Sequence, residues 1–306
     1  MPSLSPAELS YLRTSLESNP PVRPDARAVA QFRPLQASTN FLPTTNGSAR
    51  VRTADGSECI VGVKAKVIQL DSNSVKDNNS YPIEKLVAVD VDIAGLRDDH
   101  VGATLISSTL QQMLVNSQIL NNGNRLKLTS KFAFRLHIDA LVMSHSASNP
   151  LNLLSLTIYL ALMSTKLAKL ISSADDNAAE EIPVFDDDWD NAIPLTNSRT
   201  SDNLYYKPPL LFIFAVVGEN LLIDPSKDEE IVSEGGILMG WENGKIAAPL
   251  RFIELSTGRS KGIKPQMLNK AYKLALEAGN DVSESLDLIA KLDKEDELEY
   301  GPPSMF

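Results

Sequence analysis

Apolar and polar residues alternate along three stretches in the first half of the chain, residues 59–70, 86–93 and 131–144. Successive side chains of a strand point to opposite faces, so this period of two predicts three half-buried strands. Within 86–93 the valines share one face, and Asp90 and Asp92 share the other. The two aspartates are therefore expected on the polar side of a strand.

Two turn sequences predict hairpins. Asp55–Gly56 lies between two β-rich runs, and Asn243–Gly244 lies inside residues 237–250. Both dipeptides favour the left-handed backbone of a two-residue hairpin turn. Residues 208–225 contain two further apolar runs. A second group of strands is thus expected in the second half of the chain.

The first predicted helix has a clear beginning and end. Ser5 is placed to cap it, Pro6 suits the first helical position, and Glu8 completes a capping box. The Asn19–Pro20–Pro21 stretch ends it, because proline cannot continue a helix.

Three later segments follow a helical pattern, residues 98–119, 150–172 and 264–292. The second is apolar nearly all round, as expected of a helix buried at the centre of a fold. In the third, Gly279 marks a potential interruption. The acidic residues 293–306 are expected to form a disordered tail.

Strands precede helices in each half of the chain, and an acidic segment at 175–191 followed by a polar stretch separates the halves. This order predicts an α+β fold of two units instead of a uniform βαβ alternation. The expected divisions are an N-terminal helix at 1–20, a first subdomain at 21–200, a second subdomain at 201–292, and the tail.

Composition narrows the class of protein. The net charge of −10 argues against a free-standing nucleic-acid-binding protein, which needs clustered basic residues. Cys59 is the only cysteine, so neither an intrachain disulfide nor a Cys-based zinc site can form. The first residues hold no signal-peptide run, and the longest apolar stretch, within 150–172, is too short for a bilayer. We therefore expect a soluble, intracellular protein.

The stretch VDVDIAGLRDDH (89–100) carries two aspartate pairs and could suggest a carboxylate or metal site. The pattern favours solvated or loop-capping roles for these residues, because nothing local brings a second ligand or base to them. Asp98 and Asp99 stand where a helix should begin, and a helix N-terminus favours carboxylates.

Other chemically suggestive residues are also explained without a site. The histidines lack the spacing of paired metal ligands, and Asp186–Asp188 fits an exposed acidic loop better than a cation site. The histidines are His100, His137 and His145. No phosphate-binding loop, dinucleotide motif or nucleophile elbow occurs. The sequence therefore predicts no metal site and no cofactor.

Four segments match, in order and spacing, the segments of one known family. VRPDARAVAQFRPL (22–35) resembles an R-P-D-G-R…R-P-L start, and residues 46–67 are similar to the hairpin and long strand that follow it. Residues 86–95 are similar to the next strand, and residues 208–230 resemble a segment that ends in D-P-x-x-x-E-E. On these residues the chain resembles the RNase PH-like ring subunits of the eukaryotic RNA exosome, from about residue 20 to residue 290.

The resemblance implies two tandem RNase PH-like subdomains with mixed sheets packed against helices. It also implies a structural place in a hetero-oligomeric ring whose central channel threads single-stranded RNA for 3′-to-5′ processing and decay. The implied partners are other RNase PH-like ring subunits, especially a paralogue of catalytic lineage, S1/KH-domain cap proteins and hydrolytic exoribonucleases. No membrane is involved, and the implied locations are nucleus, nucleolus and cytoplasm.

The chain departs from the catalytic members of this family. They hold phosphate with a Ser-Arg or similar pair before the central helix, whereas residues 148–152 read Ser-Asn-Pro-Leu-Asn here. The archaeal counterpart lends arginines from the preceding helix, but residues 101–120 contain no basic residue. Carboxylates do remain in the second-half segment, at Asp224, Glu229 and Glu230. Without a phosphate site they fit stabilisation of a turn and a helix start, so no catalytic residue is expected.

Two further residues follow from the resemblance. In catalytic-type relatives the loop after the strand at 86–93 carries arginines that touch RNA, so Arg97 is the implied RNA-binding residue. Its alternative role is an ion pair with Asp98, Asp99 or a neighbouring subunit. Ala26 replaces the glycine that is usual in the family. If the backbone there has positive φ, alanine costs about 1 kcal/mol.

Two other functions stay open. The chain could be a phosphorolytic 3′-to-5′ exoribonuclease within the ring that uses Asp224 and Arg97 in an unrecognised arrangement. It could also be a regulatory adaptor, whose acidic segment 175–191 and acidic tail attract basic partners by electrostatic steering.

Overall fold

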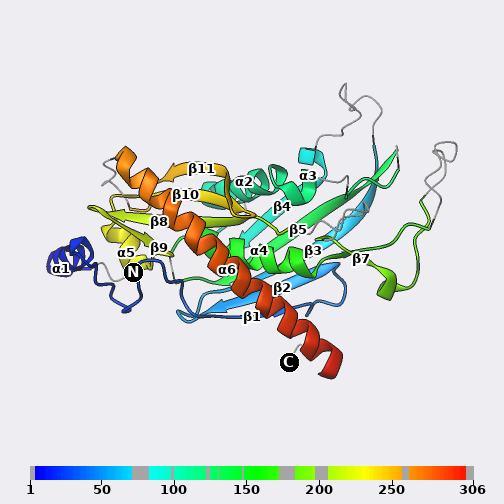
Figure 1. Ribbon diagram of the computed structural model, residues 1–306, viewed down its shortest axis with the longest axis horizontal. Helices are drawn as coiled ribbons and strands as arrows, with labels where there is room; N and C mark the ends of the chain where they lie inside the picture. Colours follow the sequence, from blue (N-terminus) through cyan, green and yellow to red (C-terminus); the bar gives the residue numbers. More distant parts are fainter. Residues whose placement is uncertain are drawn as a thin grey trace.

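The computed structural model describes residues 4–70, 83–97, 100–121, 125–129, 131–146, 148–171, 183–196, 206–256 and 262–300, with side chains as far as residue 293. Some predictions lie outside these residues. They are the loop at 71–82, Asp98 and Asp99, residues 175–182 of the acidic segment, the boundary near residue 200, and the tail beyond residue 300. Figure 1 shows the arrangement of the elements.

The first sheet contains the three predicted long strands and the first predicted hairpin. Its order is β1-β2-β3-β5-β4; β4 pairs with β5 in parallel, and the other neighbours are antiparallel. The strands are β1 (Leu35–Thr39), β2 (Gly47–Thr53), β3 (Glu58–Gln69), β4 (Val87–Ile93) and β5 (Phe132–Ser144). The predicted faces of β4 are confirmed, because its valines at 89 and 91 are buried whereas Asp90 and Asp92 are exposed.

The second sheet is antiparallel, with the order β11-β10-β8-β9. Its strands are β8 (Leu210–Val217), β9 (Asn220–Ile223), β10 (Gly235–Glu242) and β11 (Lys245–Ile253). The predicted turn between β10 and β11 is confirmed, since Asn243 and Gly244 have φ values of 49° and 75°. Two positive φ values in succession give the backbone twist that a tight hairpin needs.

Helix α4 (Leu151–Ser164) lies between the two sheets, and every one of its residues is buried. It packs against β2 and β3 of the first sheet and β8 of the second. The predicted central helix is confirmed, but its predicted end at residue 172 is wrong. The chain instead turns into the short pair β6 (Lys166–Leu167) and β7 (Ile193–Pro194), because Asn46 bonds to both main-chain groups of Lys166.

Helix α2 (Val101–Val115) and the short α3 (Gln118–Asn121) occupy the segment predicted to be helical. Helix α2 packs along β4 and covers the open edge of that strand. Ser107 Oγ donates to the Val89 carbonyl at 2.6 Å, and Gln111 Nε2 donates to the Val87 carbonyl at 3.3 Å. These bonds satisfy an edge that could otherwise pair with another chain.

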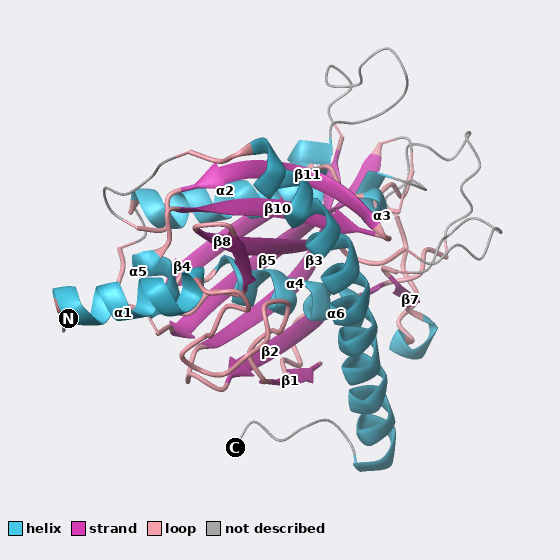
Figure 2. Cartoon of the chain, turned by 60° about the vertical axis from the view of Figure 1, so that its left-hand side comes forward, coloured by secondary structure: helices cyan, strands magenta, loops and turns pink. Residues whose placement is uncertain are grey.

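Helix α6 (Pro265–Tyr300) crosses the molecule and extends beyond both sheets (Figures 1 and 2). The interruption considered at Gly279 is absent, because this glycine lets the helix lie against the buried Trp241 ring. A Cβ at residue 279 would lie 2.4 Å from Trp241 Nε1. The prediction that disorder begins at residue 293 is wrong as far as Tyr300, since the helix continues to that residue.

The remaining described elements are α1 (Pro6–Glu17), α5 (Lys227–Val232), η2 (Ile83–Lys85) and η4 (Trp189–Asn191). The capping box predicted for α1 is present, with Ser5 and Glu8 bonded to each other's backbone N–H groups. Buried residues of both sheets, α4 and α6 form one contiguous core. The two halves of the chain therefore stabilise each other.

Candidate functional site

Three arginines of the irregular segment before β1 enter the junction between the two halves. Arg23 is buried and forms a two-pronged ion pair with Glu229 of α5, with N–O distances of 2.7 Å for both Nε and Nη2. Such parallel bonds between a guanidinium and a carboxylate fix both groups in position. This pair joins the N-terminal segment to the second half of the chain.

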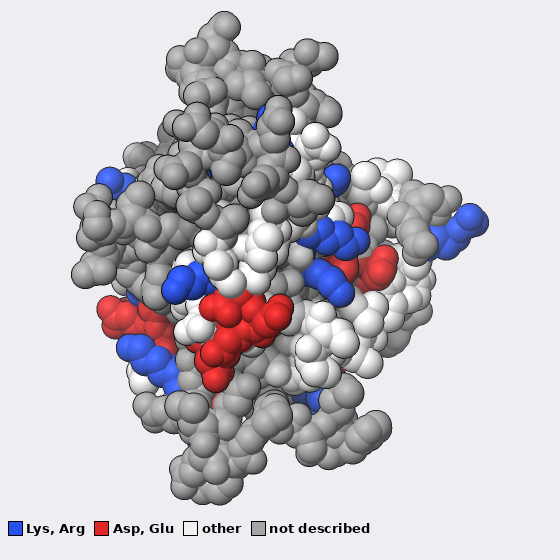
Figure 3. All heavy atoms as spheres, turned by 90° about the vertical axis from the view of Figure 1, so that its right-hand side faces the viewer, with Lys and Arg blue, Asp and Glu red and all other residues white. Residues whose placement is uncertain are grey.

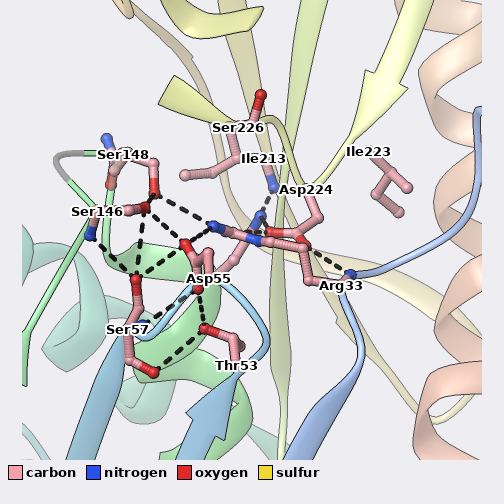
Figure 4. Close-up of polar contacts among 12 residues, drawn as sticks. Arg33, Thr53, Asp55, Ser57, Ser146, Ser148, Ile213, Ile223, Asp224 and Ser226 are labelled. Carbon is pink, nitrogen blue, oxygen red and sulfur yellow. Dashed lines mark hydrogen bonds and ion pairs between the residues drawn. The ribbon is translucent and has the colours of Figure 1, made fainter. Parts of the chain in front are cut away.

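Arg33 lies at the centre of the site and contacts two carboxylates (Figure 4). Its Nη2 and Nε donate to the Asp224 carboxylate at 2.7 and 2.9 Å, and its Nη1 donates to Asp55 Oδ2 at 2.6 Å. Burial alone would raise the pKa of Asp224, but the bonds and charge of Arg33 hold that pKa below its usual value. Asp224 is therefore ionised, and both of its carboxylate oxygens accept from Arg33.

Asp55 follows β2 at the predicted hairpin turn. It accepts hydrogen bonds from hydroxyl groups as well as from Arg33. Ser146 Oγ donates to Asp55 Oδ2 at 2.6 Å, and Ser57 Oγ donates to the same oxygen at 3.0 Å. Although burial acts in the opposite direction, bonds from Ser146 and Thr53 and the Arg33 charge lower the pKa of Asp55. The turn residue thus serves as the anionic end of a polar network that reaches the start of α4.

The residue before the N-cap of α4 is bonded to another acidic side chain. The Asn149 N–H donates to Glu230 Oε1 at 2.8 Å, and the Leu151 N–H donates to Asn149 Oδ1 at 3.1 Å. Burial raises the pKa of Glu230 to about 8. Asn152, one residue further, donates its amide to Asp224 Oδ1 at 3.3 Å. Side chains of this chain therefore occupy two of the N–H donors at the end of the helix where an anion would bind.

A cleft of about 660 Å³ opens beside this network, and its lining includes charges of both signs. The lining arginines are Arg27 and Arg33, and the lining carboxylates include Asp25, Asp55 and Asp228. Arg27 Nη1 donates to the Asp224 carbonyl at 3.1 Å and its Nε donates to Asp25 Oδ2 at 2.5 Å. Among the described residues, the buried Arg27 Nη2 has no hydrogen-bond partner.

Comparison with known proteins gives the family. The model of the 3′ exoribonuclease family, domain 1, matches residues 31–168. The exosome complex component RRP42 of Saccharomyces cerevisiae is 42% identical over 93% of this chain and 99% of its own length. The chain belongs to the RRP42 family of exosome components.

A second fungal member supports this placement. The exosome complex component rrp42 of Schizosaccharomyces pombe is 31% identical, over 76% of each chain. The resemblance seen in the sequence motifs is therefore confirmed.

Solved structures confirm the RNase PH fold. A chain of the Archaeoglobus fulgidus exosome with RNA bound to the active site has a TM-score of 0.66, with 16% identity, covering 90% of this chain and 96% of that one. A chain of an archaeal exosome core has a TM-score of 0.64 at the same identity, covering 91% and 96%. In the described residues, no helix is long and apolar enough to cross a membrane.

Arg97, the implied RNA-binding residue of this RRP42-family chain, is not part of the network. It is exposed in the segment after β4, and its carbonyl accepts a bond from the His100 N–H at 2.9 Å. His100 caps α2, because its Nδ1 accepts the Gly102 N–H at 3.1 Å. The capping role expected of Asp98 or Asp99 is thus filled by the following residue.

The other suggestive residues have the structural roles that the sequence favoured. Asp188 caps η4 by accepting the Asp190 N–H at 3.0 Å, and Asp186 accepts the Asp188 N–H at 3.1 Å. His137 lies half-buried on the polar face of β5. Within the described part of the chain, no group of three or more histidine, cysteine or acidic residues could hold a metal ion.

The roles of the arginines at 23, 27 and 33 and of Asp55 were not predicted from the sequence. The arginines were part of the matched R-P-D…R-P-L motif, but their partners lie about two hundred residues away in the chain. The D-P-x-x-x-E-E motif contains those partners. Two charged motifs of opposite sign, one in each half, were the available signal for this contact.

Proposed function

We propose that the chain is a structural, catalytically inactive subunit of an exosome ring. It supports 3′-to-5′ RNA processing and decay by shaping the RNA channel and docking other subunits. One observation carries the proposal of inactivity: acidic side chains of the chain itself occupy the Asn149 N–H just before α4 and the guanidinium of Arg33.

Phosphorolysis needs a phosphate ion held beside the scissile bond by positive or hydrogen-bond-donating groups. At the corresponding end of α4, Glu230 holds the Asn149 N–H, and no basic residue occurs between Ser148 and Asn152. Each arginine of the site is already paired with a carboxylate of the chain, so an entering phosphate would have to compete with that carboxylate. These features support a subunit that does not bind phosphate here.

Helix α2 also supplies no catalytic group to a neighbour. Residues 101–120 contain no Lys or Arg, and the exposed apolar side chains of α2 are Val101 and Leu105. At the end of the molecule drawn in Figure 3, acidic and basic side chains lie next to one another in the described part of the surface. Interleaved charge suits contacts with protein neighbours better than a continuous RNA-binding surface.

The partners that this role requires are other RNase PH-like ring subunits, S1/KH-domain cap proteins, hydrolytic exoribonucleases and single-stranded RNA in the channel. The names of the RRP42 relatives support membership of an exosome, and family membership supports locations in the nucleus, nucleolus and cytoplasm. No cofactor is part of the proposal.

Arg97 is the proposed contact to RNA, supported by its exposure in the segment after β4. In the assembled ring, Arg97→Glu should weaken binding of single-stranded RNA by about fivefold and reduce its salt dependence. Fluorescence anisotropy across a salt series measures both. Arg251→Glu, on exposed β11, is the matched control. Equal affinities for the Arg97 variant and the unaltered ring would remove Arg97 from the RNA path.

A phosphate-dependent assay tests inactivity. The purified chain, and the assembly isolated with it, are incubated with RNA and inorganic phosphate, and nucleoside diphosphates are measured. The proposal predicts that this chain contributes no phosphate-dependent release of nucleoside diphosphates. Release of diphosphates that disappears with Asp224→Asn would contradict it.

The second candidate is a phosphorolytic exoribonuclease acting within the ring. Arg27 Nη2 favours it, because this buried group lies 3.9 Å from Glu229 Oε2 without a hydrogen-bond partner, and a phosphate oxygen could accept from it. Isothermal titration of the folded chain with inorganic phosphate separates the two functions. Binding that Arg27→Gln abolishes would support the enzyme, and the absence of binding supports the structural subunit.

A further inference from the structure

The two edges of the first sheet differ in how far the described chain covers their main-chain groups. The β4 edge is covered by hydrogen bonds from Ser107 and Gln111 of α2. Strand β1 forms the other edge, at the lower side of the sheet in Figure 2, and pairs only with β2 in the described structure. An uncovered edge strand presents unpaired main-chain groups that can bind another strand.

The register shows which groups of β1 face outward. The Ala54 N–H donates to the Pro34 carbonyl at 2.9 Å, and the Asn40 N–H donates to the Ser48 carbonyl at 2.9 Å. Directly opposed residues of an antiparallel pair alternate between bonded and non-bonded, so Gln36 and Ser38 bond inward to β2. The N–H and C=O groups of Leu35, Ala37 and Thr39 therefore point to the outer edge.

One of these outward groups confirms the geometry. The Thr39 N–H donates to Asp293 Oδ2 of α6 at 2.8 Å, so α6 closes that end of the edge. No described contact uses the main-chain groups of Leu35 and Ala37 on the outer side. This leaves two donors and two acceptors, spaced two residues apart, as an extended peptide requires.

Two grooves flank the same strand. One, of about 360 Å³, is lined by Gln36, Ala37, Ser38, Arg50 and Arg52. The other, of about 420 Å³, lies against Pro34, Leu35, Gln36 and Arg52 among others. Arg52 of β2 lines both grooves, and alternate side chains of a peptide paired with β1 would point to the same face of the sheet as Arg52.

The charge at this edge indicates which kind of peptide would bind to it. Arg50 is paired with Glu58 at 2.5 Å, whereas the exposed Arg52 makes no ion pair with any described residue. An acidic side chain at the matching position of an added strand would pair with it. Single-stranded RNA fits poorly, because the two grooves contain no aromatic side chain on which bases could stack.

We propose that the β1 edge binds an extended, acidic segment of a partner subunit as an additional strand of the first sheet. Main-chain bonds to Leu35 and Ala37 hold the segment, and a carboxylate on it pairs with Arg52. The inference rests on the proposed function, because the partner belongs to the same assembly.

Hydrogen exchange compares the full chain alone with the chain inside the assembly isolated from its source cells. The account predicts that the amides of Leu35 and Ala37 exchange at least tenfold more slowly in the assembly, whereas the Thr39 amide changes little. Unchanged exchange at Leu35 and Ala37 in an intact assembly overturns the inference and leaves the proposed function standing. A chain that enters no assembly overturns both.

A photo-crosslinking amino acid at Gln36 then identifies the occupant. The expected product is a peptide with acidic residues from another subunit, and its yield should fall at least fivefold with Arg52→Glu. Lys66→Glu, on the exposed side of β3, is the matched control and should leave the yield unchanged. A crosslink to RNA or to a second copy of this chain would overturn the proposal.

Discussion

At the scale of single residues, two left-handed backbone positions shape the site. Asp224 and Ala26 have φ values of 48° and 59°, a region that non-glycine residues rarely adopt. Asp224 gains bonds from Arg33 in return, whereas the Ala26 side chain is exposed and gains no such compensation. The strain expected from the replaced glycine is thus present at Ala26.

Ala26→Gly should raise the free energy of unfolding by about 0.5–1 kcal/mol, because glycine removes the left-handed strain while it adds some freedom to the unfolded chain. Urea denaturation measures the difference. Ala28→Gly is the control; Ala28 is also exposed but is outside the left-handed region, so that variant should lose stability. Equal effects of the two substitutions would show that strain at Ala26 is unimportant.

Glu230 makes the stability of the chain depend on pH. Burial raises its pKa to about 8, so the folded state holds the proton more tightly than the unfolded state does. The resulting stabilisation is complete below the unfolded pKa and is lost as the pH rises through about 8. Asp55 and Asp224 have lowered pKa values, so their contributions are already constant above pH 5.

The unaltered chain should therefore lose more stability than Glu230→Gln between pH 5 and pH 8, by about 3 kcal/mol. Glutamine keeps an acceptor for the Asn149 N–H but cannot ionise. Denaturation curves at several pH values test this, with the exposed Glu254→Gln as control. Parallel pH profiles for the unaltered chain and Glu230→Gln would contradict the burial of this carboxyl.

The sequence contains only part of the information on these residues. The capping roles of Ser5 and Glu8 were predictable, because their partners lie within three residues. The partners of Arg23 and Arg33 could not be assigned from spacing, because the fold alone brings Glu229 and Asp224 to them. Contacts between residues close in the sequence can be predicted from the sequence, whereas contacts between distant segments can be assigned only once the fold is known.

At the scale of elements, α6 shows how packing overrides propensity. Glycine inside a helix usually costs stability, which made Gly279 a natural place for a break. The helix is continuous because the Trp241 ring fills the space where a side chain would be. A tertiary contact likewise decides where α4 ends. After Ser164 the chain leaves the helix, and Asn46 hydrogen-bonds to the main-chain N–H and C=O groups of Lys166.

Gly279→Ala should lower the free energy of unfolding by about 2 kcal/mol, since the added methyl would overlap the indole ring. Helix propensity alone predicts the opposite sign. The neighbouring exposed Asn280→Ala, measured in the same denaturation assay, should be neutral or slightly stabilising. A stabilising Gly279→Ala would mean that the contact with Trp241 is absent.

Strands were predicted more reliably than helix ends for a physical reason. Alternation over eight or more residues reflects burial on one face, and the sheet preserves it, as in β4 and β5. Helix boundaries depend on the neighbours that capture the last main-chain groups. The lengths of α4 and α6 therefore could not be read from the pattern alone.

At the scale of the whole molecule, the N-terminal segment holds the two halves together through ion pairs of different burial. Arg23 and Glu229 are fully buried, whereas Arg13 pairs with Glu17 and Glu234 near the surface. Removing one partner of a buried pair leaves the other charge without compensation. An exposed pair contributes little because water screens it.

Arg23→Met should therefore destabilise the chain by about 3–5 kcal/mol. Arg13→Met, a matched loss of an arginine, should cost less than about 1 kcal/mol. Thermal and urea unfolding of both variants give the comparison. Similar losses for the two variants would show that the buried pair does not join the halves.

The proposed place in a ring is the central claim for the whole molecule. Its most direct test is the native mass of the tagged chain, isolated gently from its source cells. The account predicts one large assembly that contains other RNase PH-like subunits and S1/KH-domain caps in addition to this chain. A monomer, or an assembly of this chain alone, would contradict it.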